Sequence, residues 1–251
     1  MSDLDKSIDG AVKLLGTARS VVVSTGAGIS KESGIPTFRD APNALWANYD
    51  PQTLASPEGF RQDPALVWRW YEDRRRMIGA AKPNPGHFAI AKLQEFFDDF
   101  VVITQNIDDL HRKAGSQNIV EVHGNVFRYK CFDMEHPIEE LPDDDNVPPK
   151  CSCGSLIRPD VVWFGEMLPA SALERSFASL ERCDTMLVVG TSGIVYPAAG
   201  FPAVAKRAGA NVIEVNPEAT PITMEADVFL KGPAGEVLPV LVERFMETRS
   251  E

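Results

Sequence analysis

The stretch Val21-Val22-Val23-Ser24-Thr25-Gly26-Ala27-Gly28 decides the fold class of this chain. Its apolar half has the length and the β-branched composition of a buried strand, and it runs directly into a glycine turn. A turn of this kind lets the backbone approach the pyrophosphate of a dinucleotide. A third glycine would complete the dinucleotide fingerprint, but the chain has Lys31 there. A tight turn that the fold itself requires explains the pattern equally well, so the turn alone assigns no function.

Strand-like and helical segments alternate along most of the chain. Helical periodicity is found at residues 4–19, 170–180, 202–208 and 236–246. Strand-like apolar runs follow the one at 21–25, at residues 100–104, 119–122, 161–164, 186–189, 212–215 and 228–230. This alternation predicts an α/β fold with a doubly wound, Rossmann-like parallel sheet. Such sheets bind their ligands beyond the C-terminal ends of the strands.

Two stretches interrupt the alternation. Residues 36–90 hold prolines, tryptophans and an arginine-rich helical pattern, and residues 125–159 hold an acidic, proline-rich loop between cysteines. We therefore expect two insertions into one large domain, a helical one at residues 36–90 and a cysteine-containing one at residues 125–159. The large Rossmann-like domain would comprise residues 1–35, 91–124 and 160–251.

The composition excludes several classes of protein. A net charge of −11 argues against a non-specific nucleic-acid binder, which needs a basic face to displace counterions from phosphate. No stretch reaches the roughly 18 apolar residues that a membrane span needs, and the acidic N-terminus lacks the pattern of a signal peptide. The four cysteines do not suggest a disulfide scaffold. We therefore expect no nucleic-acid or membrane partner, and a cytoplasmic protein with reduced thiols.

Six ordered blocks of the chain resemble the sirtuin family. Residues 26–30 and 33–39 resemble its NAD-binding loop, residues 104–111 its second block, and residues 121–124 the block with its catalytic histidine. Further blocks are similar at residues 161–166, 190–192 and 195–198. The resemblance runs from about residue 12 to residue 245. It implies an NAD-dependent protein deacylase that forms a single catalytic unit over residues 1–251. The resemblance further implies a large dinucleotide-binding domain and a smaller domain made of the helical insertion (36–90) and a zinc-ribbon-like lobe (125–159).

The resemblance implies a role for each block. His123 is implied as the base that removes a proton from a ribose hydroxyl, and its ordinary pKa near 6.5 suits that role. Asn106 and Asp108 are implied as the other catalytic residues. The products would be free lysine, nicotinamide and O-acyl-ADP-ribose. The residues implied to bind NAD are Gly26, Ala27, Gly28, Ile29, Phe38, Arg39, Gln105, Asn106, Ile107, Asp108, Gly190, Thr191, Ser192, Asn216, Glu218 and Ala234.

The implied partner is an acylated lysine of another protein. A peptide carrying it could pair as a strand between two extended segments, held by main-chain hydrogen bonds. A plain core strand that ends at a turn fits the periodicity of these segments equally well. The residues implied to contact the peptide are Val161, Trp163, Phe164, Gly165, Val195 and Tyr196.

Tyr71 and Arg74 bear on the acyl group. They stand three residues apart in a predicted helix and therefore share a face. The pair resembles the one in class III sirtuins, which remove succinyl, malonyl or glutaryl groups, and Ala55 agrees with the small residue beside their acyl pocket. An arginine can bind a carboxylate with two charge-assisted hydrogen bonds, and a tyrosine hydroxyl can add a third. We expect a preference for acidic acyl-lysines, with deacetylation as a second activity.

The cysteine pattern departs from that of the family. Sirtuins usually hold a structural zinc ion with two Cys-x-x-Cys pairs. Here the partner position of Cys131 is Met134, and the second pair is shortened to Cys151 and Cys153. The three thiolates and a fourth ligand can make a zinc site, but the spacing does not require one, so zinc stays open. The candidate fourth ligands are Asp133, Glu135 and His136.

Three other functions compete with deacylation. An NAD-linked oxidoreductase would keep the third glycine and an acidic residue for the adenosine ribose, and both are missing at the expected places. Mono-ADP-ribosyl transfer by a member of the same family stays open as a side activity, although it would have no use for Tyr71 and Arg74. A non-catalytic module that binds NAD or acyl-lysine would not need Asn106, Asp108 and His123 together. The sequence leaves the oligomeric state open.

Overall fold

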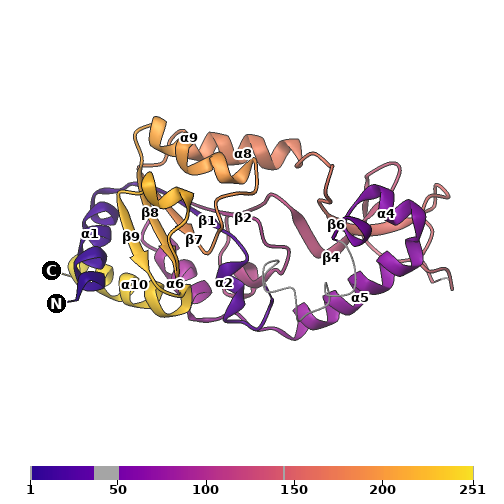
Figure 1. Cartoon of the computed structure of the whole chain (residues 1–251), viewed down its shortest axis with the longest axis horizontal. Coiled ribbons are helices and arrows are strands. Elements are labelled where there is room, and N and C mark those ends of the chain that lie inside the picture. The colour runs from indigo at the N-terminus through magenta and orange to yellow at the C-terminus, as the bar shows by residue number, and fades with distance from the viewer. Residues whose placement is uncertain (1, 37–50, 144, 251) are drawn as a thin grey trace.

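A six-stranded parallel sheet forms the main body of the molecule (Figure 1). The computed structural model describes residues 2–36, 51–143 and 145–250. In spatial order the strands are β3 (Ile119–Glu121), β2 (Asp99–Thr104), β1 (Ser20–Thr25), β7 (Thr185–Val189), β8 (Asn211–Asn216) and β9 (Val228–Lys231). The chain builds outward from β1 in both directions, so the strand order reverses between β1 and β7. This confirms the predicted Rossmann-like α/β fold and places its topological switch point beside β1.

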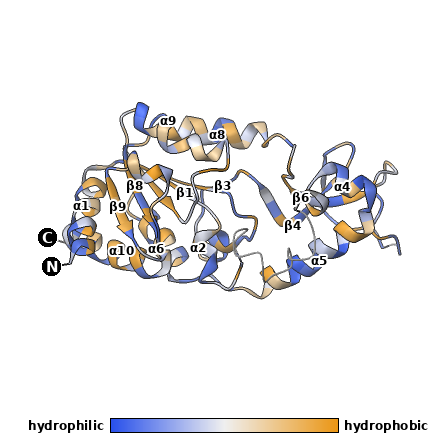
Figure 2. Cartoon of the chain, viewed as in Figure 1, coloured by the Kyte–Doolittle hydropathy of each residue, from blue (hydrophilic) through white to orange (hydrophobic). Residues whose placement is uncertain are grey.

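Helices cover both faces of this sheet (Figure 1). One face packs against α1 (Asp3–Thr17), α6 (Pro85–Gln94) and α10 (Ala234–Ser250), and the other against α8 (Ala170–Leu180) and α9 (Phe201–Arg207). The strands of the sheet are mainly apolar, whereas the covering helices carry both apolar and polar residues (Figure 2). Strands buried on both faces explain why the sequence shows continuous apolar runs instead of alternation.

A smaller lobe lies at the end of the molecule away from the two termini (Figure 1). It contains α3 (Pro51–Leu54), α4 (Pro57–Gln62) and α5 (Pro64–Ala80). These helices accompany a three-stranded antiparallel sheet in the order β5 (Pro137–Ile138), β4 (Gly124–Cys131) and β6 (Ile157–Val161). The short helices α2 (Gly28–Lys31) and α7 (Leu110–Lys113) and the 3-10 turns η2 (Ala198–Gly200) and η3 (Pro221–Met224) lie in connections.

Two segments differ from the sequence prediction. The run at residues 161–164 is not a strand of the parallel sheet, because β6 ends at Val161 and pairs antiparallel with β4. Its apolar character comes from Trp163, which packs against the helices of the small lobe. The second difference concerns α6, whose Ala89 and Ile90 lie in the core of the large sheet although residues 36–90 were expected in the small domain. The exact division into two domains stays a proposal.

In the ranges that the structure describes, no helix combines the length and the apolar character that a membrane crossing requires.

Candidate active site

The segments that follow four parallel strands meet at one edge of the large sheet. Gln105 follows β2, and its side-chain amide donates to the Thr191 hydroxyl beyond β7 at 3.2 Å. The Asn216 amide at the end of β8 donates to the Thr191 carbonyl at 2.8 Å. The glycine turn after β1 lies against the same segment, because the Gly28 amide donates to the Gly190 carbonyl at 2.8 Å. The structure therefore brings these predicted cofactor residues together where a doubly wound sheet binds its ligand.

The glycine turn has a packing role that the structure makes plain. A Cβ atom on Gly28 would lie 2.6 Å from the Gly190 carbonyl oxygen, and one on Gly26 would lie 2.9 Å from the same atom. Gly190 itself has a φ of 60°, which favours glycine. The close approach of these two backbones explains the glycines without any ligand. Their contact with a pyrophosphate stays a proposal.

A buried polar network joins the glycine turn to the segment after β2. The Asn106 amide donates to the Gly26 carbonyl and to the Ser30 hydroxyl, each at 3.1 Å. Ser30 in turn donates to one Asp108 carboxylate oxygen at 2.6 Å, and the Leu110 amide donates to the other at 3.0 Å. Burial raises the pKa of Asp108, and these two hydrogen bonds oppose the shift. The network fixes the side chains of both predicted catalytic residues.

Ser30 is a member of this network that the sequence prediction missed. It is 1% exposed and bridges Asn106 and Asp108. The available signal was its position in the block that begins at Gly26, since a serine there is polar but falls on the inner side of a short helix. A hydroxyl can donate to a carboxylate while it accepts from an amide, so it suits the position between them.

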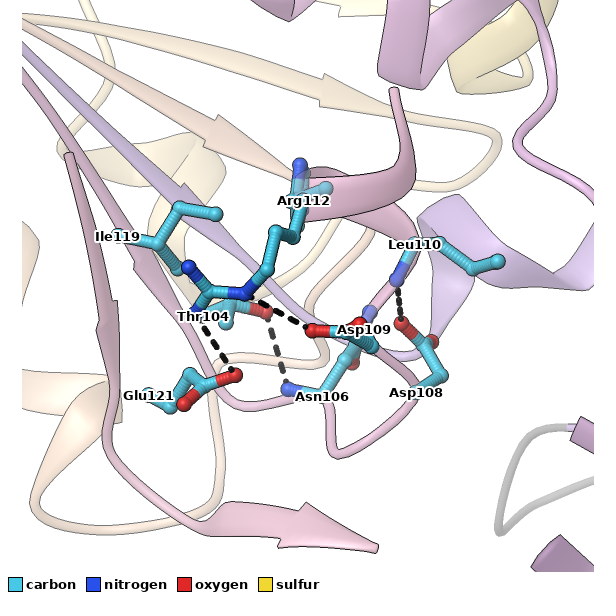
Figure 3. A pocket seen from close by; sticks show the side chains of 9 residues that line it. Thr104, Asn106, Asp108, Asp109, Leu110, Arg112, Ile119 and Glu121 are labelled. Atoms are coloured by element: carbon cyan, nitrogen blue, oxygen red, sulfur yellow. Dashed lines mark hydrogen bonds and ion pairs between the residues drawn. The ribbon is translucent and has the colours of Figure 1, made fainter. Parts of the chain in front are cut away.

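A small cavity lies behind this segment (Figure 3). In Figure 3 Arg112 extends toward Asp109 and Glu121, whereas the Asp108 carboxylate turns away toward the Leu110 amide. The ion pairs of Arg112 therefore do not involve Asp108. The residues that line the cavity are Thr104, Asn106, Asp108, Asp109, Leu110, His111, Arg112, Ile119 and Glu121.

His123 lies in the turn between β3 and β4 and has a defined tautomer. Its Nδ1 atom is 2.9 Å from the Gln105 carbonyl oxygen. Because a carbonyl oxygen can only accept, Nδ1 carries the proton and Nε2 keeps its lone pair. Burial lowers the pKa of His123, and the bond to Gln105 opposes that shift. A neutral imidazole with a free Nε2 is what a general base requires.

The residues predicted to bind the acyl group lie close together in the small lobe. Tyr71 and Arg74 both lie on α5, and Trp163 donates its indole N–H to the Tyr71 hydroxyl at 2.9 Å. Burial raises the pKa of Tyr71 to about 12, so the phenol stays protonated at neutral pH. Burial also lowers the pKa of Arg74, and the charges of Tyr71 and Asp108 oppose that shift. Ala55 is joined to the group because its carbonyl accepts from the Phe164 amide at 2.8 Å.

The predicted peptide-binding residues divide by exposure. Val161 and Trp163 are buried in the core of the small lobe. Phe164 is 49% exposed, Val195 47% and Tyr196 78%, so these apolar side chains are accessible to a partner. The Val162 amide donates to the His123 carbonyl at 2.9 Å, which places this segment directly beside the candidate base.

The remaining residues predicted to bind NAD differ in how deeply they are buried. Ile29 is fully buried, and Ala234 is buried at the start of α10. The Ile107 carbonyl accepts from the Val126 amide at 3.0 Å, whereas Glu218 is exposed. Ser192 is partly buried beyond β7. Two further candidates, Phe38 and Arg39, lie outside the described residues.

Three thiols converge in the small lobe. The Sγ atoms of Cys131, Cys151 and Cys153 all lie within 4.8 Å of one another. His136 stands beside them, with its Nε2 atom 3.2 Å from the Cys151 Sγ atom. Cys183 is buried apart from this group, in the core under α8 and α9. Three thiolates with an adjacent imidazole fit the tetrahedral coordination that zinc prefers.

Comparison with known proteins places this geometry in a family. The model of the Sir2 family matches residues 26–197. The "NAD-dependent protein deacylase" of Thermococcus kodakarensis is 52% identical over 250 residues, with 96% of each chain covered. A Sir2 homologue in complex with NAD is 43% identical with a TM-score of 0.87, covering 96% of this chain and 94% of that one. Sir2Af2 bound to a myristoylated histone peptide is 36% identical with a TM-score of 0.77, covering 98% of this chain and 99% of that one.

The family match covers more than half of the chain, and the relatives cover nearly all of it. The region that the family model matches contains the glycine turn, the Asn106 network and His123. The chain belongs to the Sir2 family.

Proposed function

We propose that this chain is an NAD-dependent protein-lysine deacylase with a preference for acyl groups that end in a carboxylate. The first part is supported by the names of its relatives and by the fold. The second part is supported by one observation: Tyr71 and Arg74 lie one turn apart on α5, close enough for the charge of each to shift the pKa of the other.

Deacylation assigns a task to each part of the candidate site. NAD supplies the ribose carbon that receives the acyl oxygen as nicotinamide leaves. Asn106 and Asp108, fixed by Ser30 and by the Gly26 carbonyl, orient the ribose and the carboxamide. His123 removes a proton from a ribose hydroxyl at its free Nε2 atom, so that this oxygen can attack the acyl carbon. The hydrogen bond from Nδ1 to Gln105 holds the imidazole in the required tautomer.

The acyl preference follows from electrostatics in a partly buried site. A guanidinium removed from water gains most from a carboxylate that can accept two of its hydrogen bonds. Tyr71 supports the same ligand because its pKa of about 12 keeps its hydroxyl proton at neutral pH. An acetyl group offers neither charge nor acceptor at that depth. A long apolar chain, such as the myristoyl group in the peptide of Sir2Af2, would have to displace water from Arg74 without replacing its hydrogen bonds.

A comparison of acyl groups on one peptide tests the proposal. Wild type and Arg74→Met are incubated with NAD and with succinyl-, acetyl- or myristoyl-lysine versions of the same sequence, and the products are followed by mass spectrometry. We expect the wild type to favour succinyl-lysine. In Arg74→Met the succinyl-to-acetyl ratio of kcat/KM should fall by about tenfold or more, since charge-assisted hydrogen bonds are lost.

Arg76→Met is the matched control. Arg76 lies on the same helix, but it is exposed and pairs with Asp73 on the surface. We expect this variant to keep the wild-type ratio. If Arg74→Met lowered kcat/KM equally for the succinyl and the acetyl peptide, Arg74 would not select the acyl group. The proposal that the chain is a deacylase would be unaffected by that result.

A further inference from the structure

We propose that Trp163 determines acyl specificity by orienting the Tyr71 hydroxyl. Its indole N–H occupies a lone pair of the phenol oxygen and directs the phenol proton toward the acyl carboxylate. This inference rests on the proposed acidic-acyl preference and assigns a positioning residue to the same site.

The hydrogen bond between the two side chains sets the direction of donation. The Trp163 Nε1 atom lies 2.9 Å from the Tyr71 hydroxyl oxygen. An indole N–H can only donate, so the phenol oxygen must accept and its own proton must point elsewhere. Among the residues that the structure describes, none accepts that proton. Both side chains are buried, Trp163 at 2% and Tyr71 at 4% exposure, so water does not freely replace a missing acceptor.

Trp163 is itself held rigidly from both sides. The Arg158 guanidinium stacks 3.3 Å from the centre of the indole ring, and Arg158 is 1% exposed. Glu166 forms an ion pair with Arg158 and accepts from the Trp163 backbone amide at 2.8 Å. On the small-lobe side the Phe60 ring lies 5.3 Å from the indole. A ring fixed in this way offers its N–H in one direction only.

This geometry makes the Tyr71 hydroxyl a selective donor. A hydroxyl that accepts one hydrogen bond becomes a stronger donor in the next, because hydrogen bonds in a chain polarise each other. Because Tyr71 keeps its proton and no described residue accepts it, an acceptor on the ligand would satisfy this donor. A succinyl or malonyl carboxylate provides that acceptor at the end of the acyl chain, whereas an acetyl methyl group does not. The indole therefore favours acidic acyl groups without touching them.

A double-mutant cycle tests the coupling. Trp163→Phe removes the N–H but keeps an aromatic ring for Arg158, and Tyr71→Phe removes the hydroxyl. The two single variants and the double variant are assayed with succinyl- and acetyl-lysine peptides. We expect each single change to lower the succinyl-to-acetyl ratio of kcat/KM by about three- to tenfold, mainly through a higher KM for the succinyl peptide. The double variant should lie no lower than Tyr71→Phe alone.

Both peptides are assayed on the same preparation, so a loss of folded protein cancels from the ratio. Trp68→Phe is the control, because Trp68 stacks on Tyr129 at 5.5 Å in the outer part of the small lobe, and its ratio should equal that of the wild type. Two results would overturn this inference and leave the proposed function standing. In one, the losses in the succinyl-to-acetyl ratio of the two single variants add up in the double variant; in the other, Trp163→Phe lowers kcat/KM equally for both peptides. A wild type without any acidic preference would overturn the proposed function, and this inference with it.

Discussion

At the scale of single residues, one hydrogen bond to the main chain sets the tautomer that His123 needs to act as a base. The Gln105 carbonyl lies on the segment that also carries Asn106 and Asp108, so the tautomer of His123 is set by the same turn that positions the cofactor residues. Such coupling means that a change in the backbone after β2 would alter several functional groups together.

The pH dependence of catalysis should report the lowered pKa of His123. Burial stabilises the neutral imidazole, so the active form persists below the ordinary pKa of 6.5. We expect kcat/KM to fall on the acid side with a midpoint below pH 6.5, measured with a neutral acyl-lysine peptide whose own groups do not titrate there. A midpoint at or above pH 6.5 would contradict the assignment.

His123→Ala should lower turnover by about 10²- to 10⁴-fold while NAD binding is largely retained.

Residues of the site differ in how well the sequence predicts them. Gln105, Asn106, Asp108 and His123 fall in blocks with a recognisable order, and the structure gathers them at the strand ends. Arg158 had no such signal, because a charged residue in a strand is normally expected at the surface. Its burial follows from Trp163 and Glu166, which lie five and eight residues further along the chain and which no periodicity of the sequence marks as its partners.

At the scale of elements, α6 and α7 bring two histidines together under the candidate site. The rings of His87 and His111 lie 5.0 Å apart, and both side chains are buried. Burial lowers the pKa of His87 to about 4 and that of His111 to about 3. Both are therefore neutral in the folded protein at any pH near neutrality.

This pair should make the folded state sensitive to acid. The unfolded chain binds protons at these histidines below about pH 6.5, whereas the folded chain does not until about pH 4 and pH 3. The unfolded state thus gains more protons as the pH falls, and stability decreases through that window by up to about 1.4 kcal/mol per pH unit for each histidine. Urea unfolding at a series of pH values measures this slope. In His87→Asn the slope between pH 6 and pH 4 should be smaller than in the wild type; an unchanged slope would exclude His87 as its source.

Elements of the large sheet were predictable because continuous apolar runs mark strands that are covered on both faces. The same signal failed at residues 161–164, since burial of Trp163 against helices gives the same composition as a core strand. Likewise α6 lies near the helical insertion in sequence but packs against α10, and no local pattern distinguishes the two outcomes.

At the scale of the whole molecule, the small lobe depends on a modest core at its outer end. Among the residues that the structure describes, a small apolar cluster surrounds the thiols there, and it contains Trp68 and Ile157 beside Cys131 and Cys151. A metal ion that joins the end of β4 to the turn at Cys151 would link parts of the lobe that otherwise share few apolar contacts.

Removal of metal tests this role. We expect purified protein to contain about one zinc ion per chain, measured by mass spectrometry of the elements, and Cys153→Ser to contain less. Chelation should lower the thermal midpoint and expose residues 131–156 to proteolysis before the sheet domain unfolds. Cys183→Ser is the control, because that thiol lies in a different core. Metal-free protein with an unchanged midpoint would show that packing alone holds the lobe.

The contact between the Gly28 and Gly190 backbones has a consequence for how mutagenesis of this protein is interpreted. An alanine at position 28 would force apart two strand-end loops that each carry other candidate NAD residues. A variant that no longer binds NAD would then report a displaced loop, and it would say nothing about whether Gly28 meets the dinucleotide. Scanning experiments should therefore probe this turn at Ala27, which is exposed, and leave Ser30 unchanged because it holds Asn106 and Asp108.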